Sequence, residues 1–153
     1  MTMKQFYLHT RQLKILSTIL FFCISCSSLN QMALPSKRNS IDLLSVRVLM
    51  NMPNPIHSNK ENYEEGVVYI YTFNDGGGII LHEGALMQFE IDSYKPSVVV
   101  HKKEHTIYIG KENDRCWRKD VCKGLRFYYY NVPTNHKKQY DRIFNTMKIL
   151  KRK

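Results

Sequence analysis

Residues 66–84, GVVYIYTFNDGGGIILHEG, decide the fold of this chain. Apolar and aromatic side chains alternate from Gly66 to Phe73, the pattern of a β-strand. Asn74-Asp75-Gly76-Gly77 follows, and its Asp-Gly and Gly-Gly steps supply the positive φ that a tight hairpin turn requires. An apolar run at residues 79–81 begins a second strand. The stretch therefore predicts an antiparallel hairpin.

More strands are expected on either side of this hairpin. Residues 44–50 alternate apolar side chains with Ser45 and Arg47. The β-branched run at 98–100 and the segment 106–110 flank HKKEH, which predicts a second hairpin that turns at 102–104. Two further strands are expected at residues 85–91 and 125–130, whereas residues 57–65 are polar and indicate a loop or a short helical turn.

The end of the chain has the period of an amphipathic helix. Tyr140, Ile143, Phe144 and Met147 fall at i, i+3, i+4 and i+7, which gives one apolar stripe after a start near Pro133. The helix ends at 145–146, with 147–150 as a short edge strand, or continues to residue 150. Strands closed by one helix predict an α+β fold: a mostly antiparallel sheet of about six or seven strands with the helix packed on one face.

The N-terminus has the features of an export signal. Residues 1–14 are basic, residues 15–25 are uncharged and mostly apolar, and small residues follow. The apolar run is about half of the roughly 20 residues that a membrane span needs. Ile24-Ser25-Cys26 resembles the lipobox of bacterial lipoproteins, although Cys23 stands where that motif usually has Leu. The resemblance implies lipidation at Cys26, with Cys23 and plain cleavage as the alternatives.

These boundaries divide the chain into a signal peptide at 1–25, a flexible tether at 26–40 and one α+β domain at 41–153. Removing 1–25 takes away three of the 23 cationic residues and none of the 13 acidic ones, which leaves a net charge of +7. A solvated basic surface explains this charge without a ligand. Because an exported protein meets little nucleic acid, anionic lipid headgroups, acidic glycans or an acidic protein partner are the candidates if the charge binds one.

Two longer stretches carry a family resemblance. Residues 64–87, EEGVVYIYTFNDGGGIILHEGALM, resemble a stretch found in small uncharacterised Bacteroidota lipoproteins. Residues 126–150, RFYYYNVPTNHKKQYDRIFNTMKIL, are similar to the strand–helix–strand close of PsbP-like folds. The resemblance covers about a third of the chain and implies an antiparallel sheet with flanking helices and an envelope location. It implies no catalytic residues. No acidic cluster follows Cys26, which favours the periplasmic face.

The candidate recognition residues lie in and beside a charged segment at 111–126, which is predicted to be a loop. Cys116 and Cys122 are expected to form a disulfide in an oxidising periplasm and to close this loop. Aromatic and cationic residues of this kind are enriched where proteins bind their partners. The candidates are Arg115, Trp117, Arg118, Lys119, Tyr128 and Tyr130.

A catalytic site is the weaker reading of the motifs. His101 and His105 match H-x-x-E-H, but that zinc motif needs a helix, and strand-forming residues flank it here. His82 and Glu83 would have to join them in space to make a metal-dependent hydrolase. We therefore expect a lipid-anchored, non-enzymatic envelope protein without a metal or cofactor, of the immunity or accessory-subunit type. A module that binds anionic glycans or headgroups through 111–126 is the alternative.

Overall fold

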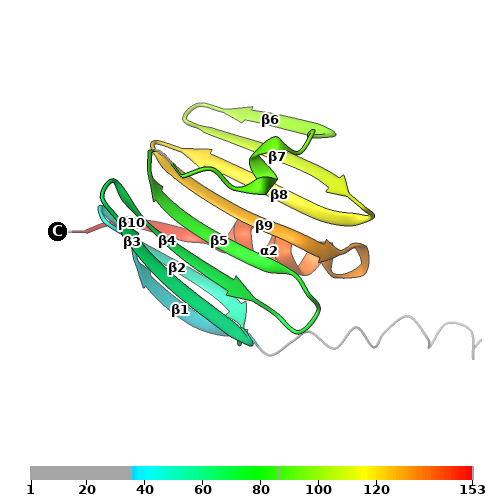
Figure 1. Ribbon diagram of the computed structural model, residues 1–153, viewed down its shortest axis with the longest axis horizontal. Coiled ribbons are helices and arrows are strands. Elements are labelled where there is room, and N and C mark those ends of the chain that lie inside the picture. Colours follow the sequence, from blue (N-terminus) through cyan, green and yellow to red (C-terminus); the bar gives the residue numbers. More distant parts are fainter. Residues whose placement is uncertain (1–35, 86, 153) are drawn as a thin grey trace, which may run out of the picture. The chain divides into compact units, whose positions relative to one another are not determined.

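The computed structural model of the chain describes residues 36–85 and 87–152 (Figure 1). These belong to a compact unit that spans residues 34–153. The predicted signal peptide, Cys23, Cys26 and the first part of the tether lie outside the described residues. Within the described ranges, no helix has the length and apolar character that a membrane crossing requires.

Within residues 36–85 and 87–152, ten strands form two antiparallel sheets, and one α-helix lies near the C-terminal end of this region. We call the three-stranded sheet, with order β1-β2-β10, the small sheet. We call the seven-stranded sheet, with order β3-β4-β5-β9-β8-β7-β6, the large sheet. The strands are β1 (Ser36–Asp42), β2 (Val46–Pro53), β3 (His57–Tyr63), β4 (Gly66–Thr72), β5 (Gly78–Gly84), β6 (Val98–Lys102), β7 (His105–Glu112), β8 (Arg115–Cys122), β9 (Leu125–Pro133) and β10 (Lys148–Lys151).

The predicted hairpin at 66–84 is confirmed. β4 and β5 pair antiparallel, and Thr72 lies opposite Gly78. At the turn, Gly76 has a φ of 78°, which favours glycine. The amide of Gly77 donates to Asp75 Oδ1 at 2.9 Å, which fixes the turn from within. The second predicted hairpin is also confirmed, since Lys102 of β6 pairs with His105 of β7.

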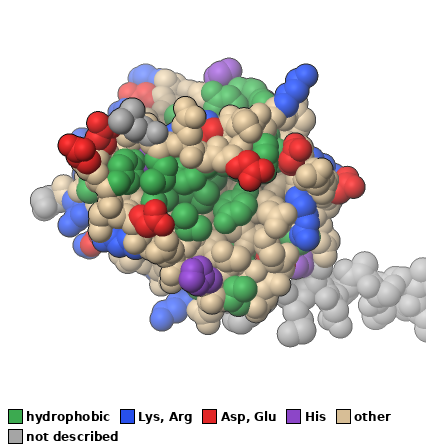
Figure 2. All heavy atoms as spheres, viewed as in Figure 1, with side chains coloured by type: hydrophobic (Ala, Val, Ile, Leu, Met, Phe, Trp, Pro, Cys, Tyr) green, Lys and Arg blue, Asp and Glu red, His purple; other side chains and the backbone are tan. Residues whose placement is uncertain are grey.

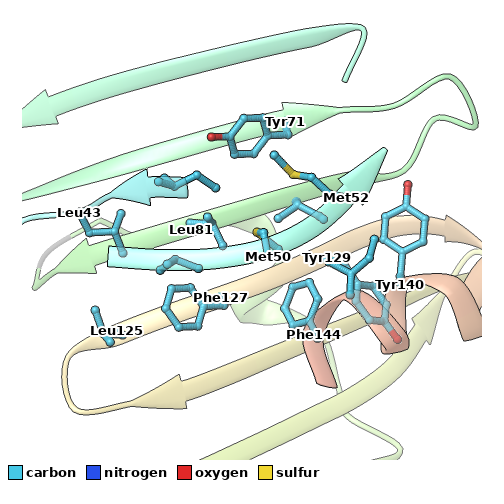
Figure 3. Close-up of a cluster of buried hydrophobic side chains, with 14 of the residues drawn as sticks. Leu43, Met50, Met52, Tyr71, Leu81, Leu125, Phe127, Tyr129, Tyr140 and Phe144 are labelled. Carbon is cyan, nitrogen blue, oxygen red and sulfur yellow. The ribbon is translucent and has the colours of Figure 1, made fainter. Parts of the chain in front are cut away.

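The main hydrophobic core lies between the small sheet and one face of the large sheet, which we call its inner face (Figure 3). Met50 and Met52 enter it from β2, and Leu81 and Phe127 enter it from β5 and β9. The helix α2 (Lys137–Thr146) adds Tyr140, Ile143 and Phe144.

Aromatic rings join the helix to β9. The ring of Tyr129 lies 5.6 Å from that of Tyr140 and 5.3 Å from that of Phe144, centroid to centroid. The helix follows the 3-10 turn η2 (Thr134–His136) and ends before β10. The prediction of an edge strand after the helix is therefore confirmed.

The predicted α+β class and antiparallel pairing are correct, but four local predictions are wrong. Residues 36–40 belong to β1 instead of the tether, so a second sheet exists that was not predicted. Residues 57–63 form the edge strand β3 instead of a loop. Residues 87–91 form no strand and lead into the 3-10 helix η1 (Glu90–Ser93). Residues 111–126 form a hairpin and the start of β9 instead of one loop.

Candidate functional site

The outer face of the large sheet carries a second hydrophobic cluster. Its buried members are Val68, Ile80, Ile91, Trp117 and Tyr128, and partly exposed apolar side chains surround them. Figure 1 shows η1 in front of this face, with α2 behind the sheet. Figure 2 shows the same face, where hydrophobic side chains gather in the middle and acidic side chains lie around them.

Asp92 of η1 fastens the segment 85–97 to the sheet. Its Oδ1 accepts hydrogen bonds from Lys119 Nζ at 2.7 Å and from the Tyr128 hydroxyl at 3.0 Å. Its Oδ2 accepts one from the Phe89 amide at 3.0 Å. Burial alone would raise the pKa of Asp92, but the bonds from Lys119, Phe89 and Tyr128 outweigh it and hold this pKa below its ordinary value.

His82 of β5 is fully buried beside this segment. Arg126 Nε donates to His82 Nδ1 at 3.2 Å, and because a guanidinium only donates, His82 Nε2 carries the proton and faces the Tyr63 hydroxyl. Burial, and then the charge of Arg126, lower the pKa of His82 to about 4. His82 is therefore a neutral structural residue at neutral pH.

The four residues of the hydrolase alternative do not meet. β5, which holds His82 and Glu83, is separated from β6 by three strands in the sheet order. At about 4.8 Å per strand, His82 and His101 are on the order of 20 Å apart. Glu83 binds the Ser45 amide, and His105 lies 3.2 Å from Asp120. Among the described residues, no three His, Cys, Asp or Glu side chains are grouped so as to hold a metal ion.

A pocket of about 250 Å³ opens at one end of the outer face. We call it the Trp117 pocket. Glu90 of η1 and Tyr94, the residue after it, form one side. The β7–β8 hairpin contributes a carboxylate, an amide and a guanidinium, and the end of β9 forms the other side. Its lining residues are Glu90, Tyr94, Glu112, Asn113, Arg115, Trp117, Tyr130 and Asn131.

Backbone turns place these side chains. Asn113 and Asp114 have φ values of 49° and 60°, as a two-residue type I′ hairpin requires, so Glu112 and Arg115 are brought opposite each other. The pairing of β8 with β9 is irregular between Cys116 and Arg118, and Asn131 has a φ of 54°. A bulge of this kind bends a strand locally, and Tyr130 and Asn131 at this end of β9 line the pocket.

Trp117 forms one wall of the pocket and is only 2% exposed. Its ring lies over Gly110, where an added Cβ would stand 2.6 Å from the indole. The Tyr94 ring lies 6.0 Å from it, centroid to centroid. The indole Nε1 is buried and makes no hydrogen bond to the protein, so a donor is left without an acceptor at this wall.

The pocket holds more negative than positive charge. Glu90 and Glu112 contribute two carboxylates, and Arg115 contributes one guanidinium, whose Nη1 lies 3.4 Å from the Asp75 carbonyl. The Tyr94 hydroxyl donates to Glu90 Oε1 at 3.1 Å. Burial, that hydrogen bond and the nearby Glu112 raise the pKa of Tyr94. The pocket therefore combines aromatic surface with a net negative rim.

Three of the six predicted recognition residues, Arg115, Trp117 and Tyr130, meet in this pocket. The other three are used elsewhere. Lys119 and Tyr128 are bonded to Asp92. Arg118 lies on the inner face, where its guanidinium contacts both oxygens of Asp120 at 2.6 and 2.8 Å. Trp117 is buried within β8, so the prediction that it lies in a loop is wrong.

The predicted disulfide is also wrong. Cys116 and Cys122 lie on the same strand, β8, and both are free thiols. Six residues of extended chain separate them by about 20 Å, whereas the Cα atoms of a disulfide are within about 7 Å of each other. Cys116 is instead buried in the main core.

The sequence interpretation missed five lining residues: Glu90, Tyr94, Glu112, Asn113 and Asn131. A signal for Asn113 exists, because Asn-Asp between two alternating segments is a favoured hairpin turn. Comparisons of the chain with protein families, with curated proteins and with solved structures find no match.

Proposed function

We propose that this chain is a non-enzymatic binding protein of the cell envelope, held at the membrane by a lipid on Cys26, and that it binds a protein partner through the Trp117 pocket. The supporting observation is the pocket itself: three aromatic side chains, two carboxylates and one buried indole N–H without an acceptor. It is slightly smaller than the roughly 300–1,000 Å³ of typical small-molecule sites, and a single side chain of a partner fits it.

The packing of the helix leaves this face available. We infer from the contacts of Tyr129 with Tyr140 and Phe144 that α2 covers the inner face of the large sheet. Among the residues that the structure describes, the outer face is then covered by the segment 87–97. Partly exposed aromatic side chains on that face, among them Tyr108 and Tyr130, extend the contact area beyond the pocket.

The chemistry of the pocket favours a cationic group. Aromatic rings attract cations through their negative faces, and the carboxylates of Glu90 and Glu112 outnumber the guanidinium of Arg115. Trp117 Nε1 is buried over Gly110 and is not reached from the pocket, so Trp117 contributes an aromatic wall to the cationic side chain. The alternative of an anionic glycan or headgroup bound through 111–126 is disfavoured, because the anion would meet both carboxylates.

The test is a variant that removes charge without disturbing the fold. Glu90 and Glu112 are exposed, so Glu90→Gln/Glu112→Gln leaves the packing intact. The control is Glu64→Gln/Glu65→Gln, an equal change on the exposed β3–β4 turn. Each full-length chain is captured from detergent-solubilised membranes, the partner is identified by mass spectrometry, and its Kd is measured.

The expected result is a stoichiometric partner that the pocket variant binds about 10-fold more weakly, as two partly solvated charge contacts contribute. The control variant is expected to bind like the wild type. Equal binding by both variants would overturn the pocket as the site. An unmodified Cys26 in the membrane-extracted chain, seen by mass spectrometry, would overturn the lipid anchor. A partner bound constitutively indicates an accessory subunit, whereas an incoming toxin as the partner indicates an immunity protein.

A further inference from the structure

The basic excess of the chain is concentrated on the small sheet. Residues 36–53 and 148–152 contain six cationic residues and one acidic residue, a net charge of +5. The remaining described residues contain 13 cationic and 12 acidic residues, a net charge of +1. The six cations are Lys37, Arg38, Arg47, Lys148, Lys151 and Arg152, and all six are exposed.

The strand register places three of these cations on the side of the small sheet that faces away from the core. Val48, Met50 and Met52 of β2 point into the core, so Arg47 and its alternate neighbours point outward. Lys148 pairs with Leu49, and Arg38 pairs with Asn51, which puts both cations on the same outward side. The one acidic residue, Asp42, is bonded to Arg47 at 2.6 Å.

Apolar side chains are exposed among these cations. Leu44 is 55% exposed, and Ile149 and Leu150 of β10 are 40% and 45% exposed. Two hollows combine both kinds of side chain. One, of about 270 Å³, has Arg38 and Lys148 beside Leu49, and the other, of about 440 Å³, has cations beside Leu150.

We infer that the small sheet docks on an anionic phospholipid surface. Anionic headgroups attract each Lys or Arg within about a Debye length of the bilayer, and the interface beneath them accepts apolar side chains. A soluble acidic glycan would match the cations but would leave Leu44 and Leu150, which pairs with the outward-facing Arg47, without a partner. The combination of charge and apolar exposure therefore favours a membrane over a soluble polyanion.

The chain connectivity brings this sheet to the membrane. This step rests on the proposed lipid anchor: nine residues separate Cys26 from Ser36, the first residue of β1. A chain of that length spans at most about 35 Å. In Figure 1 the small sheet and α2 lie behind the large sheet, whereas η1 lies in front of it. Docking through the small sheet therefore leaves the Trp117 pocket open to a partner.

The experiment measures vesicle binding without the anchor. Residues 34–153 form a compact unit that contains both hydrophobic clusters, so this fragment can be prepared alone. It is sedimented with vesicles of phosphatidylcholine, or of phosphatidylcholine mixed with phosphatidylglycerol, at low and high salt. The test variant is Arg38→Gln/Arg47→Gln/Lys148→Gln, the three cations on the outward side. The control, Lys95→Gln/Lys102→Gln/Lys103→Gln, removes three exposed lysines from elsewhere in the chain.

The wild-type fragment is expected to bind only the vesicles that contain phosphatidylglycerol, and to release them at about 1 M salt, where the Debye length is near 3 Å. Each cation near the surface strengthens binding about fivefold, so the test variant should bind roughly 100-fold more weakly. The control variant should bind within error of the wild type.

Three outcomes overturn the docking surface: no binding to phosphatidylglycerol vesicles, equal weakening in both variants, or binding to dextran sulfate without binding to vesicles. A fragment that fails to bind although full-length Cys26 carries a lipid overturns the docking surface and leaves the anchor in place. A fragment that binds while Cys26 is unmodified supports the surface and overturns the anchor.

Discussion

The burial of His82 predicts a measurable loss of stability in mild acid. Its pKa is about 4 in the folded protein and about 6.5 in an unfolded chain. Between these values the unfolded state binds the proton and the folded state does not, so stability rises with pH from about 4 to 6.5. At about 1.4 kcal/mol per pKa unit, the titration of His82 alone should lower the free energy of unfolding by about 2 kcal/mol between pH 7 and pH 4.5.

The assay is urea unfolding at several pH values, followed by the fluorescence of Trp117, the one tryptophan of the chain. The comparison is His82→Asn, which does not titrate, keeps an acceptor for Arg126 and still has an N–H. Other groups titrate equally in both proteins, so the difference between the two stability curves isolates His82. Asp92, with its lowered pKa, loses its contribution only at lower pH.

A constant stability difference between the two proteins from pH 7 to pH 4.5 would refute the reasoning. A second measurement does not depend on the folding of the variant. The imidazole proton resonance of His82 in the wild-type chain is expected to titrate with a midpoint below pH 5, and a midpoint near 6.5 would show that His82 is not held neutral by its surroundings.

Three further predictions concern packing and thiols. Gly110→Ala puts a Cβ 2.6 Å from the indole ring, and should cost about 1–3 kcal/mol in urea unfolding and shift the indole emission; wild-type stability and emission would contradict it. Asp120→Ala removes the closest carboxylate of the buried Arg118 guanidinium, which keeps Asn145 at 3.0 Å and the more distant Asp141 at 3.7 Å, and should cost up to about 3–5 kcal/mol in the same assay, whereas a loss below about 1 kcal/mol would exclude a tightly coupled pair. A maleimide should label Cys122 in the native 34–153 fragment and label Cys116 only after unfolding. If the unfolded fragment shows no free thiols without a reductant, the two cysteines form a disulfide and the assignment of free thiols is wrong.

Strands that bury apolar side chains at regular positions could be predicted from the sequence. Edge strands with few buried side chains, which depend on backbone pairing with one neighbour, could not. β4 has apolar side chains on both faces because both hydrophobic clusters lie against it, as Val67 and Val68 show. β3, HSNKENY, has no apolar alternation, since it is an exposed edge strand that depends on backbone pairing with β4. β1 is similar, with Ile41 as its one fully buried side chain.

An alternating pattern was also misassigned where it does not belong to a strand. Residues 87, 89 and 91 alternate because the segment crosses the outer face and places Met87, Phe89 and Ile91 against the sheet. The capping interaction of Asp92 with the Phe89 amide then starts a 3-10 turn instead of a strand. Spacing alone does not distinguish these two arrangements.

Only three of the eight residues that line the Trp117 pocket were predicted from the sequence, for a related reason. β8, RCWRKDVC, has the composition of a loop because both of its faces bury charge. On the inner face Arg118 is paired with Asp120, and on the outer face Lys119 is paired with Asp92. A charged side chain in the interior is stable only with its partner, and that partner comes from a distant segment for Lys119, which a single sequence does not reveal.

The same pairing supports the proposed place of binding. The charged side chains in the middle of β8 are already paired within the fold. At the start of the strand, Arg115 lies in the pocket beside the carboxylates of Glu90 and Glu112. Trp117, one step further, is fixed by Gly110 and Tyr94 but retains an unbonded Nε1. A rigid aromatic wall loses little entropy when a partner binds it, and Glu90 at its rim is already held by the Tyr94 hydroxyl. Recognition is therefore expected at this hairpin end, and the centre of the sheet serves as its support.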